Sequence, residues 1–356
     1  MGVIVSVILR ISVVATLAAV LACVPACGKK EGSRLKIGVV TNCTADFWSL
    51  CEAGANKAAN EHNVDLQFRQ LQPDFNADEQ MKVVEAWAKQ GLDGIAVSVI
   101  DPDGQTEALT RIAKKTPLVA MDNDADKTGR KCYIGVDNYE AGKAAGRLVK
   151  KALPDGGTVG LFIGSTKSAN GKARVQGVLD ELAGEKDAKG VAGKHPQKAD
   201  LDVKTYGKYH LVDGAAKEDN GPDKAQSTAA AVLARVKGMP NLCMVGLYAY
   251  NPPAILNDAK AKSMANQIKI VGFDENWETL KAIAAGEIEA TVVQDPFAYG
   301  YESVKALATK KYDVPLIPYR VVTKDGKQDA SFGGAVEEAT AFEKSLREKI
   351  DSVKKN

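Results

Sequence analysis

Short apolar runs alternate with helical stretches along this chain, and the whole alternating series occurs twice. In the first half the expected strands lie at 36–41, 64–70, 95–99 and 118–121. After the turn-forming residues 154–157 the series restarts, with strands expected at 159–163, 203–206, 244–248, 268–273 and 290–294. Strand and helix repeated at this spacing predict a parallel sheet with helices on both faces. With 356 residues, the chain exceeds the size at which one core usually stops growing, so we expect two α/β halves.

Composition excludes several classes of protein. The net charge is +2, with 45% apolar and 26% charged residues, which is ordinary for a soluble globular protein. This balance of charges points neither to a nucleic-acid partner nor to an acidic tail. We expect a monomer that binds no nucleic acid.

The first 27 residues differ from the rest, because Arg10 is their single charge and 11–22 is a run of small or apolar residues. This layout predicts a secretory signal sequence. A cysteine after a small residue resembles a bacterial lipobox, in which the cysteine becomes the lipid anchor. Cys27 is the preferred lipidation site, since Ala26 precedes it and a polar stretch follows it.

Cys23 is the alternative lipidation site, and an uncleaved transmembrane anchor is a further reading of the same segment. We expect a lipoprotein signal over 1–26 and a tether over 27–34. No other segment is apolar for the roughly 20 residues that a membrane span needs. The chain is therefore expected in the periplasm of a bacterium, held to the membrane through its lipid anchor alone.

Four further cysteines follow the leader: Cys43, Cys51, Cys132 and Cys243. Their spacing matches no metal-binding pattern. Cys43 and Cys51 are close enough in sequence to pair in an exported protein, but buried thiols are the favoured interpretation.

The apolar run 118–121 does not alternate, which indicates a strand buried on both faces. It ends at Asp122, and ligands of open α/β sheets bind just beyond the carboxyl ends of the strands. A second short strand is expected at 133–136, with Asn138 capping the next helix and Gly142 and Gly146 allowing that helix to pack closely.

A calcium loop is not expected over 122–133, although Asp122, Asp124 and Asp126 alternate there. Lys127 occupies the glycine position of such a loop, and Tyr133 occupies the position of its bidentate acid.

Polar or aromatic residues follow the apolar runs at nearly every strand end. Each has a structural explanation: Asn251 and Asp274 suit helix N-caps, Asp122 suits a turn, Trp48 suits a core and Arg174 suits a surface ion pair. Together they suit a polyhydroxyl ligand, because carboxylates and amides bind hydroxyl pairs, Arg donates in a fixed fork and an aromatic face covers a sugar ring. The predicted ligand-binding residues are Phe47, Trp48, Asp122, Asn170, Arg174, Asn251, Asp274 and Gln294.

Patterns typical of enzymes are missing from the sequence. It has no glycine-rich phosphate loop and no Gly-x-Ser-x-Gly elbow. The three histidines, His62, His195 and His210, have no acid or nucleophile pattern around them. We therefore expect a protein that is not an enzyme and that needs no cofactor or metal.

From about Lys36 to Arg347 the chain resembles type I periplasmic sugar-binding proteins of ABC importers, in the ribose- and glucose-binding branch. Eight motifs in the family order carry this resemblance. They are Ala-Asp-Phe-Trp at 45–48, Asp-Gly-Ile-Ala-Val-Ser at 93–98, Asp-Asn-Asp at 122–124, Tyr-Ile-Gly-Val-Asp-Asn-Tyr-Glu-Ala-Gly at 133–142, Asn170 with Arg174 and Gly177, Tyr-Ala-Tyr-Asn-Pro-Pro-Ala at 248–254, Val-Gly-Phe-Asp at 271–274 and Ala-Thr-Val-Val-Gln at 290–294.

The resemblance implies two Rossmann-like α/β lobes joined by a three-strand hinge that closes on the ligand. The implied lobes are 35–136 plus 295–320 and 137–294 plus 321–350. Trp48, with Phe47 beside it, would stack on the sugar. Asp122 and Asp274 would bind hydroxyl pairs from opposite lobes, and the remaining polar contacts would come from Asn170, Arg174, Asn251 and Gln294, the last at a crossing.

The sequence departs from the family pattern at several positions. Lys172 stands where many relatives have Arg, and Asp46 stands where a proline commonly precedes the aromatic pair. Asn123 replaces an Arg common in ribose binders, which argues against ribose. The region 185–222 is enlarged and is expected to be an exposed loop around one strand.

The expected function is that of a lipid-anchored receptor which captures a monosaccharide, preferably a glucose-like hexose, and delivers it to an ABC permease. A periplasmic sugar sensor or chemoreceptor-binding protein of the same fold is the alternative. A transcriptional regulator of this fold would need a helix-turn-helix ahead of Lys36, where this chain has a signal sequence.

Overall fold

The computed structural model describes residues 34–72, 74–184, 191–194, 202–219 and 221–354, and Arg34–Asn356 form one compact unit. The predicted signal sequence and both candidate lipidation residues, Cys23 and Cys27, lie outside the described residues. Among the described helices, none is both long enough and apolar enough to cross a membrane.

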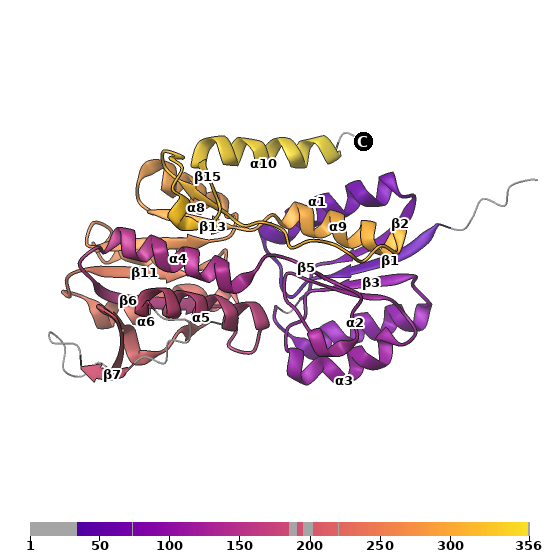
Figure 1. The fold of residues 1–356 in the computed structure, drawn as a ribbon, viewed down its shortest axis with the longest axis horizontal. Helices are drawn as coiled ribbons and strands as arrows, with labels where there is room; N and C mark the ends of the chain where they lie inside the picture. The colour runs from indigo at the N-terminus through magenta and orange to yellow at the C-terminus, as the bar shows by residue number, and fades with distance from the viewer. Residues whose placement is uncertain (1–33, 73, 185–190, 195–201, 220, 355–356) are drawn as a thin grey trace, which may run out of the picture. The chain divides into compact units, whose positions relative to one another are not determined.

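The first sheet has five parallel strands in the order β2-β1-β3-β4-β5 (Figure 1). All four positions of β3 and of β4 are buried, which confirms that the non-alternating runs are strands covered on both faces. Figure 1 shows α1 on one face of this sheet and α2 and α3 on the other. The bounds are β1 Leu35–Val40, α1 Asp46–Glu61, β2 Val64–Arg69, α2 Ala77–Gln90, β3 Gly94–Val97, α3 Pro102–Ala113, β4 Leu118–Met121 and β5 Tyr133–Ile134.

The second sheet has ten strands, nine of them in the order β15-β14-β13-β12-β11-β6-β9-β8-β7, with β10 also pairing with β6. Its centre is parallel, whereas β13–β14 and β7–β8–β9 pair antiparallel. The bounds are β6 Gly157–Ile163, α5 Ala169–Ala183, β7 Val191–Lys194, β8 Asp202–Tyr206, β9 Tyr209–Leu211, β10 Lys217–Glu218, α6 Pro222–Val236, β11 Leu242–Gly246, α7 Asn251–Ala261, β12 Ile268–Phe273, α8 Trp277–Ala285, β13 Ala290–Val293, β14 Arg320–Thr323 and β15 Ala335–Glu338.

The described part of 185–222 holds four strands, so the prediction of a loop around one strand is wrong. The segment extends the second sheet from the edge of β6. Tyr206, Tyr209 and Leu211 are buried there, in the same apolar cluster as Val159 and Leu161 of β6.

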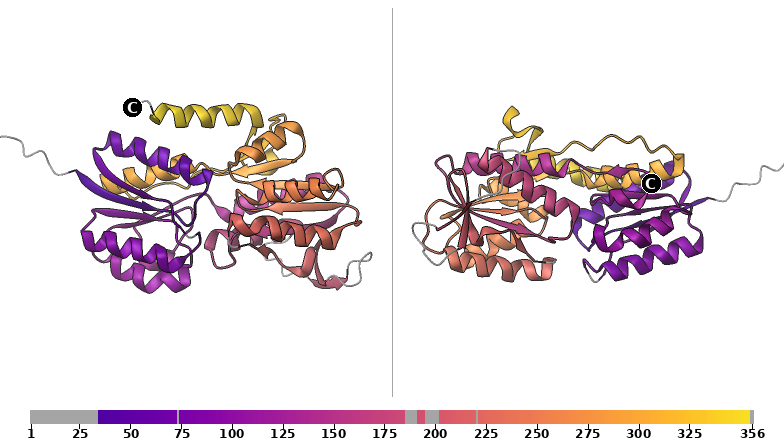
Figure 2. Two further views of the ribbon diagram at one scale, coloured as in Figure 1. Left: turned by 180° about the vertical axis from the view of Figure 1, so that it is seen from behind. Right: turned by 60° about the horizontal axis from the view of Figure 1, so that its bottom comes forward.

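The chain passes between the two sheets three times. After β5 it enters α4 (Asn138–Ala152), which packs against α5 and the second sheet. After β13 it enters α9 (Pro296–Thr309), which packs against α1 and the first sheet. An extended segment then returns to β14 (Figure 2). The backbone N–H of Ile317 on this segment donates to Gly135 O of the first crossing over 2.9 Å.

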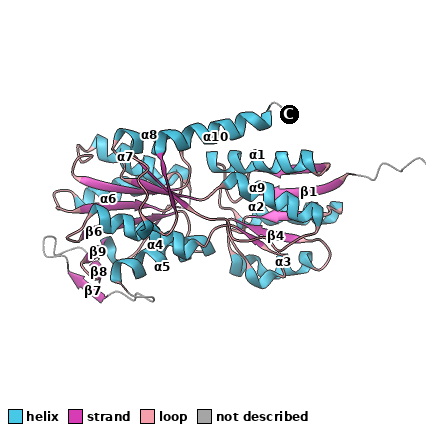
Figure 3. Cartoon of the chain, turned by 45° about the horizontal axis from the view of Figure 1, so that its top comes forward, coloured by secondary structure: helices cyan, strands magenta, loops and turns pink. Residues whose placement is uncertain are grey.

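Helix α10 (Ala339–Lys354) closes the described chain and lies over α8 and α1 (Figure 3). The sequence predicts a solvated surface helix here, but Phe342 and Leu346 are each only 1% exposed. They belong to the same buried cluster as Leu50 of α1 and the apolar residues of α8. Their spacing of four residues forms one apolar stripe, so the prediction is wrong for that face of the helix.

Two local predictions are also corrected. The N-cap of α4 is Asp137, which accepts from the backbone N–H groups of Tyr139 and Glu140, and Asn138 is already the first helical residue. The residues Asp-Pro-Asp-Gly at 101–104 also predict a separate turn, but they form the start of α3, because the Asp101 carboxylate caps the helix and Pro102 suits its first position.

The four cysteines beyond the leader are free and buried. The preference for buried thiols over a Cys43–Cys51 disulfide is therefore confirmed.

Candidate functional site

The carboxyl ends of strands from both sheets face a small cavity of about 30 Å³. Six of the eight predicted ligand-binding residues line it, three from each half of the chain. The lining residues are Asn42, Cys43, Ala45, Phe47, Trp48, Phe75, Asp122, Asn170, Arg174, Tyr248, Ala249, Tyr250 and Asp274.

Asp122 and Asp274 reach the cavity through the same left-handed backbone conformation at the end of a strand. Asp122 directly follows β4 with a φ of 58°, and Asp274 directly follows β12 with a φ of 72°. Left-handed backbone is unfavourable for a residue other than glycine, at about 1–3 kcal/mol. Each residue is held there by its backbone N–H, which donates to the neighbouring strand: Asp122 to Ile134 O (2.9 Å) and Asp274 to Val292 O (2.7 Å). The turn places each carboxylate at the cavity, where both lie near Arg174.

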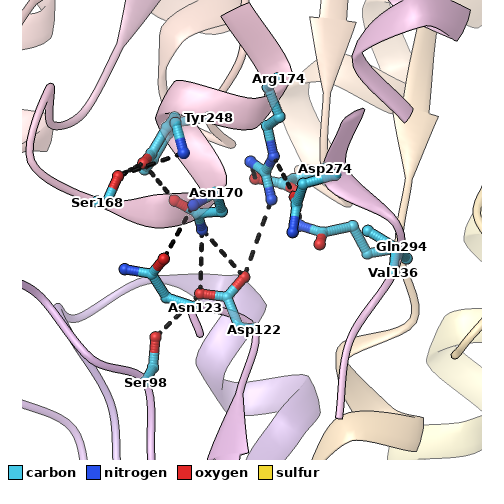
Figure 4. A network of polar contacts seen from close by, with 12 residues as sticks. Ser98, Asp122, Asn123, Val136, Ser168, Asn170, Arg174, Tyr248, Asp274 and Gln294 are labelled. Carbon is cyan, nitrogen blue, oxygen red and sulfur yellow. Dashed lines mark hydrogen bonds and ion pairs between the residues drawn. The ribbon is translucent and has the colours of Figure 1, made fainter. Parts of the chain in front are cut away.

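Arg174 lies between these two carboxylates (Figure 4). Its Nε donates to Asn138 Oδ1 and its Nη1 to Leu247 O, both over 2.8 Å, so the guanidinium plane is fixed from behind. Nη2 lies 3.9 Å from Asp122 Oδ1, and Nη1 lies 3.9 Å from Asp274 Oδ2. Within the described residues, Nη2 has no hydrogen-bond partner. Nη2 of Arg174 is therefore a charged donor at the cavity that can bond to a ligand.

Close packing of α4 on α5 places Arg174. A Cβ on Gly142 would lie 2.3 Å from Arg174 O, and one on Gly177 would lie 2.2 Å from Tyr139 O. Because only glycine allows this approach, the predicted role of Gly142 is confirmed. The guanidinium also lies 4.0 Å from the ring centre of Phe273, a favourable cation–π contact.

Burial dominates the electrostatics of the site. Desolvation raises the pKa of Asp122 to about 6, although Arg174 opposes the shift. Desolvation also raises the pKa of Asp274, again against the effect of Arg174. For Arg174 itself burial disfavours the charge, but Asp274 and Asp122 together outweigh it and hold the pKa above its ordinary value. The arginine is therefore charged, and Asp122 can exchange a proton near neutral pH.

Aromatic side chains form the other walls of the cavity. Trp48 is oriented by its Nε1, which donates to Asn42 Oδ1 over 3.1 Å, and it meets Phe47 edge to face at 4.8 Å. Phe75 meets Tyr248 edge to face at 6.4 Å from the opposite half. This combination of apolar rings and charged groups suits a ligand with both C–H faces and hydroxyls.

Gln294 and Asn251 do not line the cavity. Gln294 Nε2 donates to Asp274 Oδ1, and its Oε1 accepts from the Tyr299 hydroxyl over 2.8 Å. Asn251 Oδ1 accepts from the backbone N–H of Tyr248 over 3.0 Å. The structure therefore shows both predicted residues positioning the cavity lining from behind.

Seven lining residues were absent from the predicted set: Asn42, Cys43, Ala45, Phe75, Tyr248, Ala249 and Tyr250. Tyr248 and Tyr250 lie within a motif that the sequence does single out, so their position after β11 could have identified them. Phe75 has no such signal, because it lies in the β2–α2 loop and reaches the cavity through a φ of 53°.

Within the segment 122–133, the Asp124 carboxylate is paired with Arg130. Over the described residues, no group of three or more His, Cys, Asp or Glu side chains is placed to hold a metal ion.

Two α/β lobes joined by three crossings around a polar and aromatic cavity define a hinged, two-lobed binding protein. Comparison with known proteins agrees. The family described as periplasmic binding protein domain matches residues 37–311, and the chain belongs to this family of non-catalytic solute-binding proteins. The resemblance to type I periplasmic sugar-binding proteins of ABC importers is confirmed.

Several relatives are similar over most of their length. The D-allose-binding periplasmic protein of Escherichia coli (strain K12) is 24% identical, over 76% of this chain and 83% of that protein. The ribose import binding protein RbsB of Bacillus subtilis (strain 168) is 24% identical, over 80% of this chain and 82% of that protein. The crystal structure of GanP, a glucose-galactose binding protein from Geobacillus stearothermophilus, has a TM-score of 0.70 and 26% identity, over 82% of this chain and 98% of that one.

Proposed function

We propose that this chain binds one monosaccharide, preferably a glucose-like hexose, between its lobes and delivers it to an ABC permease. The observation that carries the proposal is the guanidinium of Arg174 held between Asp122 and Asp274, which come from opposite lobes. The relatives are named as binding proteins for allose, ribose, or glucose and galactose, which supports a pentose or hexose as the ligand.

The chemistry of the lining supports a neutral sugar. Each carboxylate can accept two hydroxyl protons, while Arg174 Nη2 and the Asn170 amide donate to hydroxyl oxygens. Hydrogen bonds to charged groups contribute roughly 1.5–3 kcal/mol each. A few of these hydrogen bonds, with Trp48 covering the apolar face of the ring, are enough for a binding free energy of about −8 kcal/mol, which corresponds to a micromolar dissociation constant.

Binding would require the lobes to move apart and close again. The cavity of about 30 Å³ is far smaller than the roughly 300–1,000 Å³ of typical ligand sites. We propose lobes of 35–136 plus 295–320 and 137–294 plus 321–350, with the three crossings as the hinge. Ligand would stabilise the closed form, because only there do Asp122 and Asp274 both reach it.

The cellular site of action is part of the proposal. We propose that the chain is exported, cleaved before Cys27 and anchored by a lipid on that residue, with Cys23 as the alternative. Mass spectrometry of the N-terminal peptide of the natural protein tests this directly. A lipidated Cys27 is the expected result, and an intact leader would refute export by this route.

The test of binding is a thermal-shift screen of the purified protein against hexoses, pentoses and polyols, followed by calorimetry. A tight ligand raises the melting temperature by mass action. We expect Asp122→Ala and Asp274→Ala each to weaken binding at least about tenfold, through the loss of one or more charged hydrogen bonds. Asp155→Ala, which removes an exposed carboxylate before β6, is the control and should bind as the wild type does. Equal affinity in all four proteins would refute the site.

A further inference from the structure

Asn123 follows Asp122 and is completely buried, yet it does not line the cavity. Its side chain makes contacts to both halves of the chain. Within the first half its Nδ2 donates to Val99 O, the carbonyl at the end of the neighbouring strand region. Toward the second half its Oδ1 accepts from the backbone N–H of Asn170 over 2.9 Å (Figure 4).

The donor of that second bond belongs to the start of α5. Asn170 is the second residue of the helix, and its N–H lies among the first four, which have no partner inside the helix. Ser168 serves as the N-cap, but its hydroxyl accepts from the N–H of Gly171. The N–H of Asn170 therefore takes its acceptor from the opposite lobe, at the positive end of the helix dipole.

The side chain of Asn170 makes the same junction from the other direction. Its Nδ2 lies 3.4 Å and 3.5 Å from the two carboxylate oxygens of Asp122, and its Oδ1 accepts from the Tyr248 hydroxyl over 2.8 Å. All of these groups are buried, so separating the lobes breaks several hydrogen bonds at once. The 2.9 Å bond from Asn123 to the backbone is the shortest direct bond of this junction between the lobes.

We propose that Asn123 is a positioning residue that caps α5 from across the cleft. Its hydrogen bond holds the lobes closed and fixes the distance between the end of β4 and the start of α5 beside the ligand. This rests on the proposed function, because closing matters for binding only if a ligand is enclosed. Asn123 acts through the position of α5, which carries Asn170 and Arg174, and not through contact with the sugar. Its side chain therefore sets how long a sugar stays bound, whichever sugar it is.

The test compares Asn123→Ala with Asn76→Ala in the purified protein. Asn76 is a matched control, since its Oδ1 also caps a helix by accepting from a backbone N–H, that of Glu79 at 3.0 Å, but within one lobe. Three quantities are measured: the melting temperature, the radius of gyration by small-angle X-ray scattering, and the dissociation rate of the tightest binder among D-glucose, D-galactose, D-allose and D-ribose. If N123A does not fold, N123S replaces it, since a serine hydroxyl is too short to reach across the cleft.

We expect both variants to melt at a lower temperature than the wild type. Only the variant at position 123 should have a larger radius of gyration and release the sugar about tenfold faster, which corresponds to about 1.4 kcal/mol. An unchanged radius of gyration together with an unchanged dissociation rate would overturn the proposal and leave Asn123 a structural residue. If the wild type binds none of the four sugars, the proposed function is wrong, and the scattering comparison still decides on Asn123.

Discussion

Tyr299 connects Asp274, a proposed ligand-binding carboxylate, to the crossings between the lobes, and removing its hydroxyl tests that connection. The hydroxyl donates to Gln294 Oε1 over 2.8 Å at the second crossing and accepts from the backbone N–H of Val136 over 3.1 Å at the first. Gln294 in turn donates to Asp274 Oδ1. Tyr299 is 0% exposed, so no solvent can replace the lost partner.

Tyr299→Phe keeps the ring and removes only this oxygen. The Val136 N–H and the Gln294 carbonyl oxygen are then left unsatisfied, at about 1–3 kcal/mol for each buried group before relaxation. We expect the free energy of unfolding in urea to fall by about 2 kcal/mol. Because Gln294 is no longer held, Asp274 loses its orientation, and calorimetry should show the sugar bound about tenfold more weakly, or about 1.4 kcal/mol.

Tyr209→Phe is the matched control for this experiment. Its hydroxyl is also buried and donates to a backbone carbonyl, Leu153 O, over 3.1 Å, but it lies in the second lobe away from the crossings. Both variants should lose stability, and only Y299F should lose affinity. If Y299F binds sugar as tightly as Y209F does, the connection from hinge to carboxylate has no role in binding.

Two further predictions concern the charged groups of the site. Arg174→Lys should weaken binding roughly tenfold to a hundredfold by calorimetry, since a lysine cannot keep the bonds to Asn138 and Leu247 while still reaching both carboxylates; an affinity within twofold of the wild type would contradict this. Affinity should fall about tenfold per pH unit below about 6, because the ligand's hydroxyls bind the ionised form of Asp122, whose pKa is raised to about 6. The same raised pKa means that the folded state binds this proton more tightly than the unfolded state, so the contribution of Asp122 to unfolding free energy should fall as pH rises from about 4 to about 6. Asp122→Asn should flatten both profiles in that window, and a pH dependence as steep as in the wild type would assign it to another group.

Much of the architecture follows from local patterns in the chain. The run 118–121 is apolar at every position because both faces of β4 are covered, and that property is visible without coordinates. The same reasoning places Asp122 and Asp274 at the carboxyl ends of their strands, where open sheets bind ligands. The spacing of Gly142 likewise indicates a close helix contact, which the packing of α4 on α5 confirms.

The directions of the side chains could not be inferred in that way. Gln294 has the residue type and position of a ligand contact, but its donor and acceptor are both used by Asp274 and Tyr299. Phe75 enters the cavity from a loop with no periodic pattern. Asn123 accepts from the start of α5, which is 47 residues further along the chain.

These differences have one physical reason. A strand or helix is set by the residues adjacent in sequence, so the chain specifies its elements, their order and the edge at which ligands bind. Which of two neighbouring polar side chains faces a ligand, and which faces the opposite lobe, depends on a single backbone φ at the strand end and on partners far away in sequence. Asp122, with its φ of 58°, turns into the cavity, while Asn123 beside it reaches α5. The different roles of these two neighbouring side chains are decided only when the two lobes are folded against each other.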